Sequence, residues 1–295
     1  MKKREHKILD HTIIGYFILL IIAEVFIGMF GFLDKFLANY IPGYGMETQV
    51  MGIDTVQASG IGYAIGSVIF VLLFTLWFRP HFKGCFSRKG LLYGLCFSLP
   101  VLVLSFIGSG LNIAEKGLAA SILIAFLKGM APAFSEEVGF RGVGIANYMR
   151  KAESEKDVMK IFWISAIFFG LIHSVNIFAG ADIVSSLVQA VSAIGMGMFF
   201  GAIYLRTGNL WPTIIAHWAI DSVEMCRADL NESAGKVMEI LTGDYFIIAS
   251  AVVGGIIGLI LVRKKYHEEI LELWNDKWNK SELNKTDLNK SDVTE

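Results

Sequence analysis

The sequence predicts an all-α fold: a polytopic transmembrane helical bundle of about eight spans. Residues of the AVILMFWYC set make up 54% of the chain, and charged residues make up 18%, against roughly 25% in a soluble domain. Of the 53 charged side chains, 28 fall within 56 residues, in the segments 1–10, 148–160 and 263–295. The rest divides into apolar stretches close to the roughly 20 residues that a helix needs to cross a bilayer. This composition excludes a disordered chain, a collagen-like chain and an ordinary soluble enzyme.

Eight apolar stretches are candidate spans. The first is not a cleavable signal peptide, because it is too long, carries Glu24 and lacks a small-residue cleavage site. The candidate spans cover residues 12–32, 57–78, 91–111, 118–147, 161–178, 183–205, 210–226 and 244–262.

The segment after the last span differs in character. Between residues 263 and 278, apolar residues recur at helical spacing, which predicts a short amphipathic helix at the membrane surface. The polar repeat that follows, NKSEL-NKTDL-NKSDV, cannot bury a core and is predicted to be disordered.

Connections rich in basic residues alternate along the chain with connections that have few. Basic residues are frequent in 1–10, 79–89, 148–160 and 263–265, and scarce in most of the connections between them. By the positive-inside rule these four segments face the cytoplasm, and both termini with them. We therefore predict a multi-pass protein of the cell membrane. The lipid bilayer is then one partner, and the net charge of −1 gives no field that would attract nucleic acid.

We predict four parts along the chain. They are the N-terminal transmembrane helices (1–117), a helical core that carries the chemistry (118–226), the last transmembrane helix (227–262), and an amphipathic and disordered cytoplasmic tail (263–295).

Ionisable residues stand inside the apolar stretches. Each costs roughly 2.5–3.5 kcal/mol at the centre of a membrane helix on insertion scales, so such residues usually serve a function. The residues are Glu24, Lys128, Glu136, Glu137, His173 and His217, with Arg141 and Asp221 close to them.

The spacing of these residues suggests which act together. Glu137 and Arg141 are four residues apart with the acid first, the favourable order for an ion pair on a helix. Glu136 points roughly 100° away and is left for chemistry. His217 and Asp221 also share a helix face, so the carboxylate can orient the imidazole. Structural readings stay open: a charged helix end for the first group, a hydrogen-bonded buried histidine at His173, and a packing pair for the last.

Depth brings the three groups together. In the predicted topology Glu136, His173 and His217 lie roughly 18, 20 and 10 Å from the cytoplasmic ends of their helices. All three then lie in the cytoplasmic half of the membrane, as one site would require. One glutamate and two histidines are the minimum set for activating a water molecule, with or without a metal.

Three motifs in this order resemble the CPBP family, also called Abi, of intramembrane proteases. They are Glu136-Glu137 with Arg141, Phe169 with His173, and His217 with Asp221. The resemblance covers about residues 118–226. The family includes CAAX prenyl endopeptidases and bacteriocin self-immunity proteins.

The resemblance implies an intramembrane endopeptidase that cleaves a membrane-associated peptide or protein near the cytoplasmic face. In such an enzyme Glu136 and His173 activate the water, His217 and Asp221 face the oxyanion, and Glu137 with Arg141 supports the geometry. Relatives are described both as metal-dependent and as glutamate-dependent proteases.

One residue departs from the family pattern. Asp221 stands where many relatives have Asn, and an ionised Asp accepts hydrogen bonds but cannot donate one to an oxyanion. It must therefore be protonated, orient His217 or ligate a metal. The set Glu136, His173, His217 and Asp221 would suit Zn²⁺ or another divalent metal.

Two other functions fit part of the pattern. A non-catalytic immunity or scaffold protein would retain the fold, although no motif residue is lost here. A secondary transporter would use intramembrane carboxylates to relay protons, with the glycine-rich segments 60–66 and 252–258 allowing movement. No inverted repeat is visible to support a transporter.

Overall fold

The computed structural model describes residues 11–41, 46–50, 53–57, 60–116, 122–177, 183–226 and 245–278. This part of the chain is helical apart from one short hairpin, so the all-α expectation is confirmed for the body of the molecule. The hairpin pairs β1 (Met46–Val50) with β2 (Ile53–Gln57) in antiparallel register. This hairpin lies almost entirely between the first two candidate spans, where the sequence predicts no regular element.

Each of the eight expected stretches contains a helix. The bounds are α1 (Thr12–Tyr40), α2 (Ile61–Trp77), α3 (Leu91–Lys116), α4 (Ile122–Glu136), α6 (Glu155–His173), α7 (Ile183–Thr207), α8 (Trp211–Glu224) and α10 (Tyr245–Leu261). The fourth stretch continues beyond α4 as a π-helix (Glu137–Ile145) and then as α5 (Ala146–Lys151). Short 3₁₀ turns occupy Arg79–Phe82, Ser174–Ile177 and Lys264–Tyr266.

Only some of these helices have the length and hydropathy that a membrane span requires. Among the described residues three helices are long and apolar enough to cross a membrane: Ile13–Tyr40, Leu91–Ala114 and Ile183–Thr207. A fourth is reached if α10 and the segment Lys264–Trp278, which meet at 57°, are counted as one bent span. Helices α2 and α8 have only 17 and 14 residues, below the roughly 20 that a crossing needs. The expected count of about eight spans is therefore not confirmed, whereas the long apolar helices are typical of a membrane protein.

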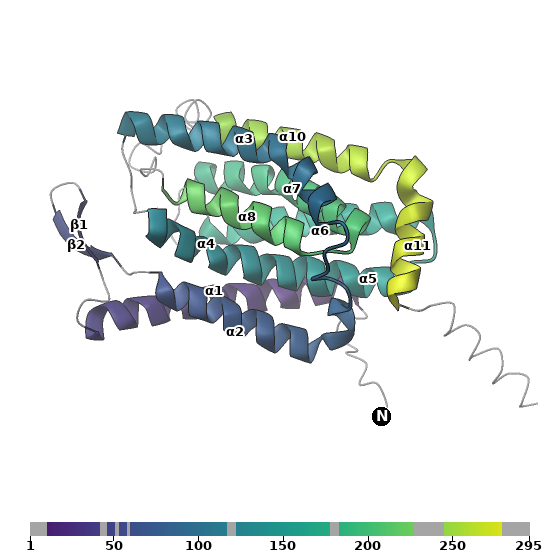
Figure 1. Cartoon of the computed structure of the whole chain (residues 1–295), viewed down its shortest axis with the longest axis horizontal. Helices are drawn as coiled ribbons and strands as arrows, with labels where there is room; N and C mark the ends of the chain where they lie inside the picture. The colour runs from purple at the N-terminus through teal and green to yellow at the C-terminus, as the bar shows by residue number, and fades with distance from the viewer. Residues whose placement is uncertain are drawn as a thin grey trace, which may run out of the picture.

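The helices lie side by side as a bundle, and α4 and α8 run through its middle (Figure 1). Helix α8 packs against α3 and α4, α4 packs against α2, and α7 packs against α6 and α10. This arrangement surrounds the residues of α4 and α8 with protein on several sides. The hairpin lies at one end of the bundle, and α11 (His267–Trp278) lies across the other end (Figure 1).

Glycines let neighbouring helices approach at two crossings. A Cβ atom added to Gly129 of α4 would lie 2.8 Å from the hydroxyl and 3.1 Å from the backbone nitrogen of Ser222 in α8. A Cβ added to Gly258 of α10 would lie 2.7 Å from the carbonyl oxygen of Met198 in α7. Small residues at helix crossings are typical of membrane bundles, where close backbone packing drives association.

The amphipathic helix predicted near the C-terminus is present as α11. Its apolar face packs against α5, α6 and α7. Ile270 and Trp274 are 1% and 0% exposed, and the Trp274 indole donates a hydrogen bond to the Leu205 carbonyl at 3.0 Å. The predicted disordered repeat lies outside the described residues.

A partly buried polar contact joins the end of α11 to the bundle. The Lys277 Nζ donates to Cys85 Sγ at 2.8 Å, and the Cys85 thiol also lies 3.0 Å from the Tyr204 hydroxyl. Burial lowers the pKa of the Lys277 ammonium group, although the neighbouring Cys85 favours its charged form. Cys85 is 0% exposed, and Lys277 is the contact that α11 makes with its thiol.

Candidate active site

The two adjacent glutamates stand at a change of helix geometry. Glu136 is the last residue of α4, and Glu137 is the first residue of the π-helix. Pro132 lies four residues before Glu136 and has no N–H for the helix ladder. A π-helix is wider than an α-helix and is often found at functional sites. The sequence did not predict this segment, because its apolar pattern is that of an ordinary helix.

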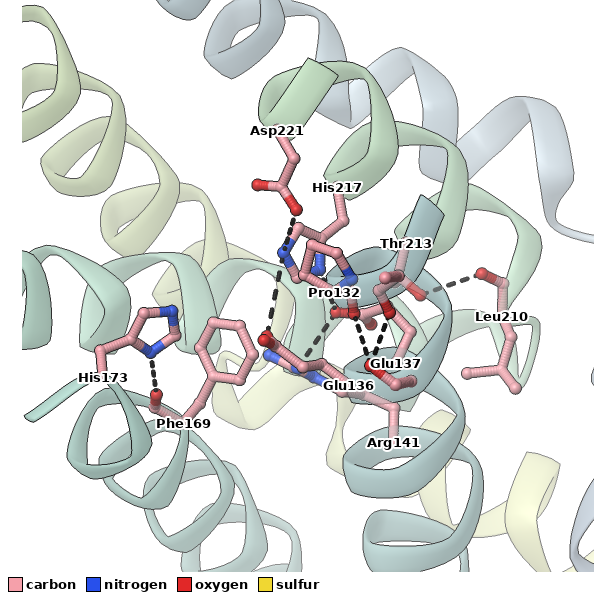
Figure 2. Close-up of polar contacts among 12 residues, drawn as sticks. Pro132, Glu136, Glu137, Arg141, Phe169, His173, Leu210, Thr213, His217 and Asp221 are labelled. Carbon is pink, nitrogen blue, oxygen red and sulfur yellow. Dashed lines mark hydrogen bonds and ion pairs between the residues drawn. The ribbon is translucent and has the colours of Figure 1, made fainter. Parts of the chain in front are cut away.

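Glu137 is held from two sides. Its Oε1 lies 3.0 Å from Arg141 Nη1 and 3.0 Å from His217 Nδ1 (Figure 2). The side chains of Glu137 and Arg141 are both 0% exposed. The Arg141 guanidinium also stacks over the Phe169 ring, with its central carbon 4.0 Å from the ring centroid. The ion pair expected from the spacing is therefore present, and it also anchors the histidine of α8.

His217 connects all three carboxylates. Its Nδ1 faces Glu137, while its Nε2 lies 3.3 Å from Asp221 Oδ2 and 3.9 Å from Glu136 Oε2. The imidazole stacks on the ring of Phe200, at 5.0 Å between centroids and 20° between planes. The ring is therefore fixed in orientation by one hydrogen bond and one aromatic contact.

Among the described residues, three buried carboxylate oxygens of the motif residues have no hydrogen-bond partner. They are Glu137 Oε2 and the two that belong to residues of the pocket, Glu136 Oε2 and Asp221 Oδ2. Buried polar atoms are normally satisfied, and exceptions often mark a functional site or an absent water or ion. The two pocket oxygens face His217 Nε2, which makes this nitrogen the meeting point of the site (Figure 2).

His173 stands apart from the other site residues. It ends α6, and its Nδ1 lies 2.8 Å from the Phe169 carbonyl oxygen of the same helix (Figure 2). A carbonyl only accepts, so Nδ1 carries the hydrogen, and Nε2 of the neutral ring is then an acceptor. The Phe169 ring contacts both His173 and His217 rings, at centroid distances of 5.2 and 5.9 Å.

One pocket joins the four candidate residues. A cavity of about 350 Å³ is lined by Glu136, His173, His217 and Asp221. A larger cavity of about 790 Å³, between Leu76 and Trp211, is lined by none of the motif residues. The smaller cavity is therefore the candidate site, because it alone of the two is lined by the motif residues.

Other residues of the pocket were not singled out as site residues from the sequence. Tyr63, Lys128 and Gln189 line it as well. Of these three, only Lys128 is recognisable from the sequence, as an ionisable residue in an apolar stretch. Phe200 gave none, because one phenylalanine among many apolar neighbours has no distinguishing pattern. The side chain of Glu24 lies outside the described residues.

The donor atoms do not form a closed set of metal ligands. Glutamate, aspartate and histidine are suitable ligands for Zn²⁺. Among the described residues, however, no group of three or more His, Cys, Asp or Glu side chains is gathered closely enough to hold an ion. His217 Nδ1 is already bonded to Glu137, and His173 lies across the pocket. As arranged, the residues fit a water molecule better than a four-ligand ion.

A comparison with known families supports the resemblance. Residues 118–223 match the family model described as type II CAAX prenyl endopeptidase Rce1-like. The matched segment is about a third of the chain and contains all three motifs. This match is consistent with the CPBP family. No curated protein and no solved structure matches the chain.

Proposed function

We propose that this protein is an intramembrane endopeptidase of the CAAX prenyl protease type. Its substrate is a membrane-associated peptide or protein, cut near the cytoplasmic face of the membrane. The observation that carries the proposal is that Glu136, His173, His217 and Asp221 line one pocket and all belong to the segment that matches the family.

In the proposed reaction a water molecule binds in the pocket between Glu136 and His173. Glu136 takes a proton from it, and the resulting hydroxide attacks the carbonyl carbon of the substrate. The carbonyl oxygen becomes an oxyanion that faces Nε2–H of His217, which supplies a preorganised donor. The proton on Glu136 then passes to the departing amine, so water has been added across one amide bond.

Glu137 and Arg141 position the acting groups in this proposal. The Glu137 carboxylate accepts from Nδ1 of His217 and so aims Nε2 into the pocket. Arg141 neutralises the Glu137 carboxylate. Of the two adjacent glutamates, Glu136 is then the one left to take a proton from water.

In a second version of the proposal, the same residues work with a bound divalent metal ion. Glu136, His173, His217 and Asp221 would hold it after a rearrangement of the pocket, and it would supply a Lewis acid. Dialysis of the purified protein against a chelator, with elemental analysis before and after, separates the two forms. Loss of bound metal together with activity supports the metalloprotease; unchanged turnover supports the glutamate-dependent enzyme.

The test of the main proposal is hydrolysis of a quenched prenylated peptide by the purified protein. Glu136→Gln should lower turnover by roughly 10²–10⁴-fold, because an amide cannot take a proton from water. Glu153→Gln makes the same change at an exposed glutamate before α6 and should leave turnover within about twofold. Substantial turnover by pure, folded Glu136→Gln would falsify this mechanism.

A further inference from the structure

The larger of the two cavities lies outside the candidate active site. Its volume of about 790 Å³ is within the range of pockets that bind small molecules, roughly 300–1,000 Å³. Helix α4 stands between the two cavities: Phe134 lines the larger one, whereas Pro132 and Glu136 line the smaller one. Among the described residues none lines both. The proposed reaction therefore gives the larger cavity no task.

Apolar side chains make most of the wall of this cavity. Val71 comes from α2, and Trp211 begins α8. Phe82 and Phe86 come from the connection between α2 and α3. The Phe82 and Phe86 rings stack at 6.1 Å and 9°, and the Phe86 ring meets Trp211 edge-on at 5.4 Å. Three aromatic rings in contact offer a continuous apolar surface, which suits a hydrocarbon chain.

The cavity opens on the apolar outer side of α2. Leu76 lines the cavity and is 70% exposed. Leu72 and Trp77 of the same helix are exposed as well. In a membrane bundle such side chains contact lipid tails, which are as apolar as leucine. A molecule that enters past Leu76 therefore comes from the bilayer.

Two basic side chains line the same cavity, and no Asp or Glu of the described residues does. Arg79 and Lys83 lie in the connection after α2, and both are exposed. This connection is at the α11 end of the bundle, where α2 ends (Figure 1) and where the rings of His81 and Trp278 lie 5.2 Å apart. It belongs to the basic segment 79–89 that is predicted to face the cytoplasm. A guanidinium and an ammonium group side by side are suited to bind a phosphate.

We propose that this cavity binds one anionic phospholipid of the surrounding bilayer. An acyl chain lies against Val71 and the three aromatic rings, and the phosphate lies at Arg79 and Lys83. The proposal goes beyond the proposed function and holds whether or not the protein cleaves a peptide. A zwitterionic lipid offers the chain without the net charge, and free phosphate offers the charge without the chain. The cytoplasmic leaflet, where the basic segment is predicted to lie, is also the leaflet with a negative surface potential.

The experiment measures lipid binding to the purified full chain in detergent by native mass spectrometry. Phosphatidylglycerol is compared with phosphatidylcholine of the same acyl chains. The wild type should bind phosphatidylglycerol at least about tenfold more tightly, since each basic residue near an anionic headgroup contributes roughly fivefold. Arg79→Gln combined with Lys83→Gln should reduce this preference to less than about threefold. Equal affinity of the wild type for both lipids would overturn the proposal.

Arg88→Gln combined with Lys89→Gln is the matched control. It removes two positive charges from the same connection, at exposed residues that do not line the cavity. The preference for phosphatidylglycerol should stay within about twofold of the wild type, because the phosphate contacts remain. If both double variants lost the preference alike, the attraction would belong to the basic surface as a whole, and the cavity would not be the site.

The acyl chain is tested separately from the charge. Val71→Trp fills part of the cavity and should weaken the binding of both lipids about tenfold, because the indole takes the space of the chain. Phosphatidylglycerol with a photoactivatable group in its chain should label α2 between residues 71 and 76. The labelling decides if thermal unfolding shows that Val71→Trp does not fold. Labels spread over the bundle, or confined to helices that do not line the cavity, would contradict the proposal.

Two competitors identify the occupant. An excess of glycerol phosphate, which has the headgroup charge and no chain, should not displace the lipid. Displacement would mean an anion site that is open to water. A prenylated peptide should not displace the lipid either. If it did, the cavity would hold the hydrocarbon chain of a substrate, and the assignment to a phospholipid would be wrong.

Discussion

At the scale of single residues, the chemistry of the site depends on where a proton lies between His217 and the carboxyl groups around it. Its two ring nitrogens face carboxylate oxygens on both sides, Glu137 on Nδ1 and Asp221 with Glu136 on Nε2. An ionised carboxylate only accepts, so the Nε2 side needs a hydrogen either on the ring or on one of the two carboxyl groups. The site is therefore built around one shared proton that can move when the substrate arrives.

Asp221→Asn tests which group needs that proton. We expect activity to fall by about 10–100-fold, the usual scale for a group that orients a functional histidine, because the amide loses the charge that holds His217 Nε2–H. The measurement is kcat/KM on the quenched peptide, with thermal unfolding as the check on folding. Equal or higher activity would mean that Asp221 acts as a protonated donor to the oxyanion, a task that an amide performs as well.

The motif residues could be predicted from the sequence to a large extent, and their surroundings could not. The i,i+4 spacings placed Glu137 with Arg141 and His217 with Asp221, because helical geometry alone decides such contacts. The bond between Glu137 and His217 joins residues 80 apart in the chain and depends on how α4 and α8 pack. Spacing carries no information about that packing.

At the scale of helices, the crossing of α4 and α8 sets the distance between Glu136 and His217. Gly129→Ala should disturb it, because the new Cβ would lie 3.1 Å from the backbone nitrogen of Ser222, which cannot move without α8. Overpacking of this kind costs about 1–3 kcal/mol. We expect a lower melting temperature and roughly a tenfold loss of turnover.

Gly139→Ala is the matched control for this crossing. It lies in the π-helix, and a Cβ there would have no other atom within 4 Å. Melting temperature and turnover should stay close to the wild type. If both alanines behaved alike, the α4–α8 crossing would not be the feature that sets the site geometry.

The helices were predictable because each is a long apolar stretch between polar or glycine-rich segments. Two local features were not. The π-helix leaves the apolar pattern unchanged, since one wider turn alters the backbone bonds and not the residue types. The hairpin strands METQV and IDTVQ are short and mixed in polarity, so they lack the strict alternation that marks a half-buried strand.

At the scale of the molecule, the C-terminal segment consists of α11, which packs on the bundle, and of residues 279–295, which lie outside the described part of the chain. Truncation after Trp278 should leave turnover within a few-fold, because the motif residues and the docking residues of α11 remain. Trp274→Ala should instead destabilise the protein by about 3–5 kcal/mol, as a fully buried tryptophan is lost. Thermal unfolding and turnover in detergent measure both. A folded truncation that loses more than tenfold in turnover would assign the last residues a role in substrate capture.

The orientation of the whole bundle is tested by reporter fusions. Fusions at residues 45 and 115 should report the external side, and those at 85, 155 and 280 the cytoplasm, because basic residues cluster at the latter. A cytoplasmic signal at 45 would contradict this orientation. It would also reverse the side from which a substrate reaches Glu136.

Because Lys277 of α11 contacts the Cys85 thiol, the reactivity of that thiol can report how often α11 separates from the bundle. Cys85 is fully covered and Cys96 is exposed. In a protein with Cys96→Ser and Cys226→Ser, a maleimide can reach Cys85 only during an opening, so the labelling rate reports the opening equilibrium. We expect Trp274→Ala to raise this rate tenfold or more, because it removes the fully buried side chain that docks α11. Because α11 closes one end of the bundle, the same rate measured with and without peptide reveals whether substrate entry requires that end to open.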